Sequence, residues 1–177
     1  GDAATTSQNL IENETLARFG IAAELALVGF QALAAVWFFK LFKKKDSFNA
    51  GLIAVFGMVN AVAILISVAF WLTALNNAIA GGDQAYTLLS FNVHENIWIV
   101  SNLFFGLWLI PMAYMTRKFN MPKALAFFLY AGGIGYVLAA FVSIVAPEQS
   151  VLIEAMPIPA TIGEFWIIGY LLFKPLK

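Results

Sequence analysis

Five long apolar stretches, separated by short polar segments, form the dominant pattern of this 177-residue chain. They cover about residues 16–39, 49–75, 93–115, 124–145 and 159–173. A helix needs about 20 apolar residues to cross the hydrocarbon core of a bilayer, and the first four stretches reach that length. Pro157 and Pro159 interrupt the fifth, so its regular helix is expected to begin near Pro159. The pattern predicts an all-α bundle of five transmembrane helices, with a polar segment over residues 1–15 and one membrane domain over residues 16–177.

The third stretch has ionisable residues at one end and basic residues at the other. From Phe91 to Lys118 it reads FNVHENIWIVSNLFFGLWLIPMAYMTRK. It begins near the only histidine of the chain, His94, with Glu95 beside it. Pro111 removes one backbone donor and predicts a kink near the opposite end. This stretch therefore predicts a membrane span with a polar mouth.

The composition indicates that much of the apolar surface faces lipid. The chain is 62% hydrophobic and 11% charged, whereas about a quarter of the residues of a soluble domain are charged. A small globule cannot hide so many apolar side chains from water. The net charge is zero, which excludes a basic surface for nucleic acid. The absence of cysteine excludes disulfides, thiolate metal sites and thiol nucleophiles.

The basic residues predict the orientation of the spans. Nine of the ten fall in the first loop, the third loop or the C-terminal tail: Lys40, Lys43, Lys44, Lys45, Arg117, Lys118, Lys123, Lys174 and Lys177. Basic residues concentrate on the cytoplasmic side of a membrane, so these segments are expected inside. The prediction is a multi-pass protein of the cytoplasmic (inner) membrane, with the N-terminus outside and the C-terminus inside.

The N-terminal segment suggests a longer parent chain. Residues 1–15 are polar and acidic, and they carry no signal that would take them across the membrane. A preceding span would place the true N-terminus inside and remove this difficulty. We therefore expect a parent chain of six spans.

Several segments together resemble a known family. FFGLWLIPMAY at Phe104–Tyr114, Pro122 and GGIGY at Gly132–Tyr136 resemble the bacterial polytopic membrane family known as domain of unknown function 4386. The positions of His94 and Glu164 also fit its pattern, and the resemblance is most specific over residues 90–173. It implies a helical membrane bundle with one further N-terminal span, and it brings no established activity, cofactor or substrate.

Four ionisable residues are the candidates for a functional site: Glu24, His94, Glu95 and Glu164. An ionisable group inside a bilayer costs about 2.5–3.5 kcal/mol on insertion scales, so such groups usually face the interior of the bundle. A helix rises about 1.5 Å per residue, which places the three carboxylates at successive depths from the outer interface to the midplane. Such an arrangement could conduct protons, bind a cation or hold a metal.

Simpler roles for the same residues stay open. His94 and Glu95 could cap the third helix near its positive dipole end. The intramembrane glutamates could join helices through hydrogen bonds to Gln31, Asn60 or Asn102. A metal at His94 and Glu95 is weakly supported, because neighbouring residues point about 100° apart on a helix. Haem ligation by His94 is a minority hypothesis, and no cofactor is expected.

Gly132, Gly133 and Gly135 in the fourth stretch predict close helix packing, because small residues let a neighbouring helix approach.

We rank three functions. The first is a non-catalytic accessory or structural subunit of a larger membrane complex, favoured by the small size and by the lack of a catalytic motif. The second is a small transporter or a proton- or cation-binding protein that uses the intramembrane carboxylates. The third is a metal-dependent intramembrane enzyme. The expected partners are membrane lipids, and either other membrane subunits or further copies of the chain.

Overall fold

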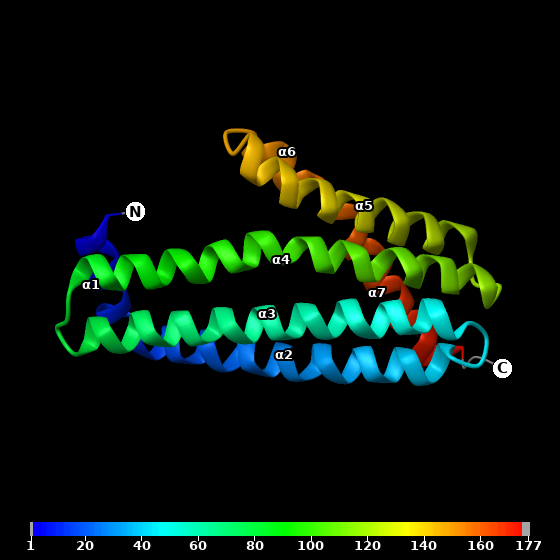
Figure 1. Cartoon of the computed structure of the whole chain (residues 1–177), viewed down its shortest axis with the longest axis horizontal. Coiled ribbons are helices and arrows are strands. Elements are labelled where there is room, and N and C mark those ends of the chain that lie inside the picture. Colours follow the sequence, from blue (N-terminus) through cyan, green and yellow to red (C-terminus); the bar gives the residue numbers. More distant parts are fainter. Residues whose placement is uncertain (1, 175–177) are drawn as a thin grey trace. The chain divides into compact units, whose positions relative to one another are not determined.

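The structure is a computed structural model that describes residues 2–174. The described chain forms only helices: α1 (Ala3–Glu12), α2 (Glu14–Phe42), α3 (Ser47–Ile79), α4 (Gln84–Lys118), α5 (Lys123–Val145), α6 (Ser150–Ala155) and α7 (Ile158–Phe173) (Figure 1). Four single helices, and the Ser150–Phe173 segment that combines α6 and α7, are long and apolar enough to cross a membrane. The predictions of an all-α fold and of five apolar segments long enough to span a membrane are therefore confirmed.

The helices extend beyond the apolar stretches. α3 ends at Ile79 and α4 begins at Gln84, so only four residues connect them, although residues 76–92 separate the second and third apolar stretches. Gly81 adopts a φ of 67°, which glycine tolerates without strain. The helices continue because backbone hydrogen bonds within a helix do not depend on whether its side chains are apolar. Hydropathy therefore marks the membrane-crossing part of a helix and not its ends.

Helix α1 was not foreseen, because residues 1–15 are polar. The Asp2 carboxylate caps it, accepting a 2.9 Å hydrogen bond from the backbone N–H of Thr5. Ser7 and Leu10 are buried, so α1 packs one face against the rest of the protein. The N-terminal segment is thus an amphipathic helix.

The chain divides into two compact units. Unit 1 comprises Gly1–Gln31 and Ala61–Val100, and unit 2 comprises Ala32–Asn60 and Ser101–Lys177. α2, α3 and α4 each contribute residues to both units. The single membrane domain over residues 16–177 stays a prediction.

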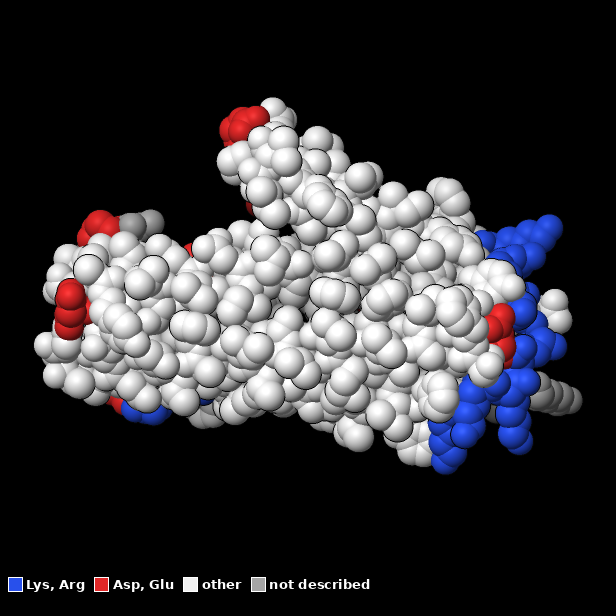
Figure 2. Space-filling view, viewed as in Figure 1, with Lys and Arg blue, Asp and Glu red and all other residues white. Residues whose placement is uncertain are grey.

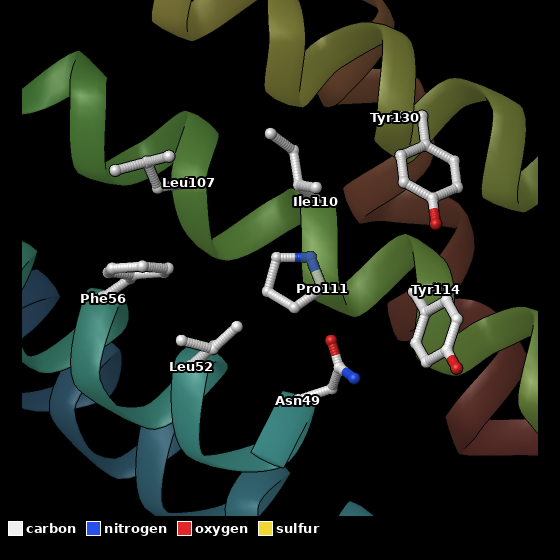
Figure 3. A pocket seen from close by; sticks show the side chains of 8 residues that line it. All are labelled: Asn49, Leu52, Phe56, Leu107, Ile110, Pro111, Tyr114 and Tyr130. Carbon is white, nitrogen blue, oxygen red and sulfur yellow. The ribbon is translucent and has the colours of Figure 1, made fainter. Parts of the chain in front are cut away.

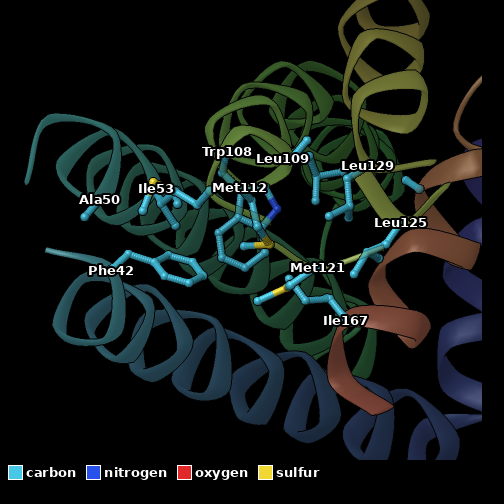
Figure 4. Packing of buried hydrophobic residues seen from close by; sticks show 13 residues of the cluster. Phe42, Ala50, Ile53, Trp108, Leu109, Met112, Met121, Leu125, Leu129 and Ile167 are labelled. Atoms are coloured by element: carbon cyan, nitrogen blue, oxygen red, sulfur yellow. The ribbon is translucent and has the colours of Figure 1, made fainter. Parts of the chain in front are cut away.

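Unit 2 has a core of buried apolar side chains around α4. Figure 4 shows Trp108 and Met112 of α4 lying between Phe42 and Ile53 on one side and the side chains of α5 and α7 on the other. The Trp108 ring meets Phe38 edge to face, with 6.0 Å between ring centroids. Gly57 of α3 lies against the same indole, where an added Cβ would come within 2.9 Å of it. A glycine thus makes room for the largest side chain of this core.

The helices leave many large apolar side chains exposed. Phe19, Phe30 and Phe165 are each more than 70% exposed. A monomeric soluble protein rarely exposes apolar patches of such extent. These surfaces suit contact with acyl chains, in agreement with the membrane-spanning lengths.

The basic residues of unit 2 gather at one end (Figure 2). They lie in the last turns of α2 and α4, in the α2–α3 connection, at the first residue of α5 and just after α7. Within this group, Lys118 Nζ lies 2.8 Å from Asp46 Oδ2. The Lys118 ammonium and the hydrogen bonds from Asn49 lower the pKa of Asp46 from its ordinary value of 3.8 to about 2.

Candidate functional site

Unit 1 brings three polar side chains from three helices together. Glu24 comes from α2, Ser67 from α3 and His94 from α4. Only 7% of His94 is exposed, and Ser67 is fully buried. A buried polar group requires partners, so the contacts among these side chains decide what the site can do.

The hydrogen bonds of Ser67 determine the tautomer of His94. The Ser67 hydroxyl donates to the carbonyl oxygen of His94 at 3.0 Å, and its oxygen lies 2.7 Å from Nδ1 of the ring. A serine has a single hydroxyl proton, so it cannot donate to both. The Nδ1 atom therefore carries a proton and donates it to the Ser67 oxygen. In the neutral ring this leaves the lone pair on Nε2.

Nε2 faces a carboxylate. It lies 3.9 Å from Oε1 of Glu24, which is longer than a hydrogen bond. The other oxygen of Glu24, Oε2, is buried and has no hydrogen-bond partner among the described residues. A basic nitrogen and a carboxylate thus face each other in a buried environment, where the two groups can share one proton.

Aromatic side chains enclose this pair. The Trp71 ring lies against His94 with 4.9 Å between centroids, and the Phe91 ring lies at 5.6 Å. Gly20 of α2 allows this arrangement, because an added Cβ there would collide with the Trp71 indole. The Trp98 side chain interacts with the Glu24 carboxylate. The low-polarity surroundings strengthen the electrostatic coupling of Glu24 to His94.

A hollow of about 640 Å³ borders the pair. Its lining consists of Glu24, His94, Glu95, Asn96, Trp98 and Ile99. Glu95 is exposed whereas His94 is buried, as expected for neighbours that point in different directions on a helix. Glu95 is thus at the mouth of the site, and Glu24 and His94 are on its inner wall.

The α3–α4 turn sets the register that pairs Ser67 with His94. The Asn77 side chain donates 2.8 Å hydrogen bonds to the Asp83 carbonyl and to the Thr87 hydroxyl. In an antiparallel helix pair, residues at similar distances from the turn lie level with each other. Ser67 precedes Asn77 by ten residues and His94 follows Thr87 by seven, so the two residues lie at similar distances from this clamp.

The structure brings only some of the candidate residues together. Glu24 and His94 are in contact and therefore level, which differs from the successive depths expected from the basic ends of the helices. The expectation failed here because it measured each helix from its own basic residues, and the contact between Glu24 and His94 shows that these residues do not give α2 and α4 a common reference level. Glu164 lies on α7 in unit 2, partly exposed and near Tyr136. Gln31 Nε2 is buried without a hydrogen-bond partner in the described part of the chain.

Two further polar candidates belong to unit 2. Asn102 is half-buried on α4. Asn60 is fully buried on α3, and both polar atoms of its side chain lack hydrogen bonds within residues 2–174. The sequence singled out Glu24 and His94 as ionisable candidates, whereas Ser67 and Trp71 were not among the candidate residues. A hydroxyl inside an apolar span was the one signal that pointed to Ser67.

The metal hypotheses have limited support from geometry. Among residues 2–174 there is no group of three or more His, Cys, Asp or Glu side chains placed to hold a metal. At His94 the described residues supply one imidazole and one carboxylate, and Glu95 is exposed at the border of the same hollow. Neither a metal nor a haem is assigned to the site.

The glycines of α5 lie at close helix contacts in unit 2. Added Cβ atoms at Gly132 and Gly135 would collide with the backbone of Ala160 and the carbonyl of Met156, on the α6–α7 side. One at Gly133 would come within 2.9 Å of the Gly106 carbonyl oxygen on α4. α5 therefore contacts neighbours on two faces through its backbone.

Pro111 lies inside α4, which continues through it, and it borders a smaller hollow of about 280 Å³ in unit 2 (Figure 3). Figure 3 shows Asn49 of α3, Tyr114 of α4 and Tyr130 of α5 around this hollow, and the other lining side chains are apolar. Because proline has no N–H, the Leu107 carbonyl lacks its usual helical donor at this point. The hollow is thus next to a local break in the backbone hydrogen bonds of α4.

Comparison with curated proteins and with solved structures gives no match. A family model described as "Domain of unknown function (DUF4386)" matches residues 1–174, nearly the whole chain. The match confirms the family resemblance seen over residues 90–173 and extends it to the N-terminal half. Unit 1, with its histidine site, therefore lies within the matched region. The chain belongs to the DUF4386 family of membrane proteins.

Proposed function

We propose that this protein binds and releases protons at the Glu24–His94 pair, as part of a small transporter or a proton-responsive membrane protein. The observation that supports this proposal best is the polarity of the His94 ring. Nδ1 is committed to Ser67, and Nε2 faces a carboxylate 3.9 Å away. The pair can therefore take up one proton without any change in the Ser67 contact.

The burial of the pair favours a functional role. An ionisable side chain buried in a protein loses its hydration, and a structural contact could be made with uncharged residues instead. Glu95 and Asn96, at the border of the same hollow, offer a polar route for a proton to the pair. Such an arrangement resembles the carboxylate–histidine relays that membrane transporters use.

The proposed orientation places the pair near the outer face. The basic residues assign the α2–α3 and α4–α5 connections to the cytoplasm, with the N-terminus outside and the C-terminus inside the cytoplasmic membrane. Arg117 follows His94 by 23 residues on α4. At about 1.5 Å per residue that is roughly 35 Å, slightly more than the thickness of the hydrocarbon core. The site would then exchange protons with the extracytoplasmic side.

The single histidine makes this proposal directly testable by NMR. With ¹⁵N-histidine as the only label, the two ring nitrogens of His94 give the only side-chain signals, in nanodiscs and across a pH series. The neutral ring is expected to show a protonated Nδ1. Two coupled groups titrate in macroscopic steps that belong to the pair, so Glu24→Gln should reduce a complex titration to one simple step.

A matched control is available on the same helix. Glu14 is partly exposed and paired with Arg18, so Glu14→Gln should leave the His94 titration unchanged. A proton-flux assay in proteoliposomes with an internal pH dye then separates binding from transport. Glu24→Gln and His94→Gln should abolish any flux that Glu14→Gln preserves. A His94 titration that is insensitive to Glu24→Gln would refute the proton-sharing pair.

A second candidate function is that of an accessory subunit, and Glu164 favours it. This carboxylate lies in the middle of a span and is partly exposed, which is unfavourable against lipid. A helix from another subunit, or from a second copy of the chain, would cover it. Native mass spectrometry after mild extraction tests this. If Glu164→Leu leaves a complex of defined stoichiometry intact, Glu164 is not the contact between subunits. If the protein is a monomer after extraction, the subunit hypothesis is rejected.

A further inference from the structure

A second and larger hollow lies in unit 1, under α1. Its volume is about 740 Å³, within the range of roughly 300–1,000 Å³ typical of small-molecule sites. The lining residues come from all four helices of the unit: Thr6, Asn9, Leu10, Asn13, Leu16, Ala17, Gly20, Trp71 and Phe91. No residue on this list also lines the hollow beside Glu24 and His94.

The lining has two chemically different sides. Thr6, Asn9 and Asn13, on α1 and just after it, supply hydroxyl and amide groups. The aliphatic and aromatic residues, with Trp71 and Phe91 among them, supply an apolar surface. None of the described residues that line the hollow is charged. A charged ligand would lose its hydration here without gaining an opposite charge, whereas hydroxyl and carbonyl groups could hydrogen-bond to the α1 side.

Two features of the chain keep this space open. Buried Ser7 and Leu10 anchor α1 on one face, so the helix is fixed beside the hollow instead of filling it. Gly20 has no side chain and admits the Trp71 ring against α2, which forms part of the wall.

We propose that this hollow binds an uncharged single-chain amphiphile from the membrane, with an aliphatic chain and a hydroxyl- or carbonyl-bearing head group. The chain would lie against Leu16, Trp71 and Phe91, and the head group would lie against Thr6 and Asn9. A bound molecule would touch the Trp71 and Phe91 rings that cover His94. The proposal does not depend on proton binding at His94.

Photo-crosslinking in nanodiscs tests this site. The probe is a monoacylglycerol with a diazirine in its acyl chain, and labelled peptides are mapped by mass spectrometry. Saturable labelling is expected within residues 6–20 and around Trp71 and Phe91. Unlabelled monoacylglycerol should compete. A fatty acid anion and an alkyltrimethylammonium of the same chain length should compete roughly tenfold less well, because the site does not compensate for their charge.

Matched variants separate this site from general contact with lipid. Ala17→Phe should fill the hollow and abolish the saturable labelling, whereas Ala26→Phe, at an exposed position on the same helix, should preserve it. If Ala17→Phe does not accumulate, the double variant Thr6→Val, Asn9→Leu replaces it. Thr6 is partly exposed and Asn9 is exposed, and the double variant removes the contacts with the head group, so it should weaken the labelling. Unsaturable labelling spread over the lipid-facing helices, or equal competition by the charged analogues, would overturn the proposal.

Discussion

Asp46, in the connection between α2 and α3, pairs with Lys118 at the end of α4. The pKa of the Asp46 carboxyl is lowered to about 2, first by the Lys118 hydrogen bond and then by the backbone N–H of Asn49. A carboxyl with a depressed pKa in the folded protein stabilises it at pH values above its ordinary pKa. We therefore expect this contribution to be complete above pH 3.8, to decline as the pH falls, and to be lost below about pH 2.

Thermal unfolding of the detergent-solubilised protein between pH 2 and 7 measures this effect. Asp46→Asn should lower the midpoint temperature at neutral pH and make it less dependent on pH in the acid range. Glu154→Gln, at an exposed position on α6, is the control and should leave the profile unchanged. The same acid dependence in Asp46→Asn and in the unaltered protein would show that another carboxyl is responsible.

Single residues also show what sequence reasoning could and could not find in the site. Glu24 and His94 were identifiable because ionisable side chains are rare and costly in a span. Ser67 and Trp71 were not, because serine and tryptophan are ordinary residues in membrane helices and have many roles there. Their function depends on lying level with His94, which follows from the α3–α4 turn and not from any local pattern.

Helix α5 illustrates how glycines determine packing at the level of whole elements. Gly132→Ala would place a methyl group into the backbone of Ala160 on α7. The backbone cannot move aside as a flexible side chain can, so we expect a loss of about 1–3 kcal/mol, or more, in the free energy of unfolding. Unfolding by SDS in mixed micelles, followed by circular dichroism, measures the change.

Gly169→Ala on α7 is a suitable control for that prediction. Among residues 2–174, no atom outside the adjoining backbone of α7 lies within 4 Å of the methyl group that it would add. Alanine favours a helix by up to about 1 kcal/mol over glycine, so this variant should be neutral or slightly more stable. Equal stability of the two variants would mean that α5 and α7 pack less closely than described.

The elements themselves were predictable to different degrees. The five spans followed from hydropathy, because only helices of sufficient length satisfy their backbone groups in lipid. Their ends and α1 did not follow, because polar residues form a helix as readily as a loop when capping and packing support it. Asp2 supplies the cap, and Leu10 supplies the buried contact. Both are ordinary residues, and neither marks a helix by itself.

At the scale of the whole molecule, the proposed orientation is the property on which the function depends most. The chain has no cysteine, so single cysteines can report topology without background. Ser47 and Ser150 are both exposed serines at the start of a helix, and they lie on opposite sides in the proposed topology. In intact cells, a membrane-impermeant maleimide should label Ser150→Cys, whereas Ser47→Cys should react only after permeabilisation.

The outcome of this labelling also decides the direction in which the histidine site works. If Ser150 is outside, the opening beside Glu95 faces the extracytoplasmic solution, and His94 responds to the external pH. If Ser47 reacts in intact cells instead, the basic residues do not follow the positive-inside rule and the site opens to the cytoplasm. The Glu24–His94 pair could still bind a proton in that case, because its geometry does not depend on orientation. A sensor or importer of external protons would then be excluded, and cytoplasmic pH would be the signal to which the pair responds.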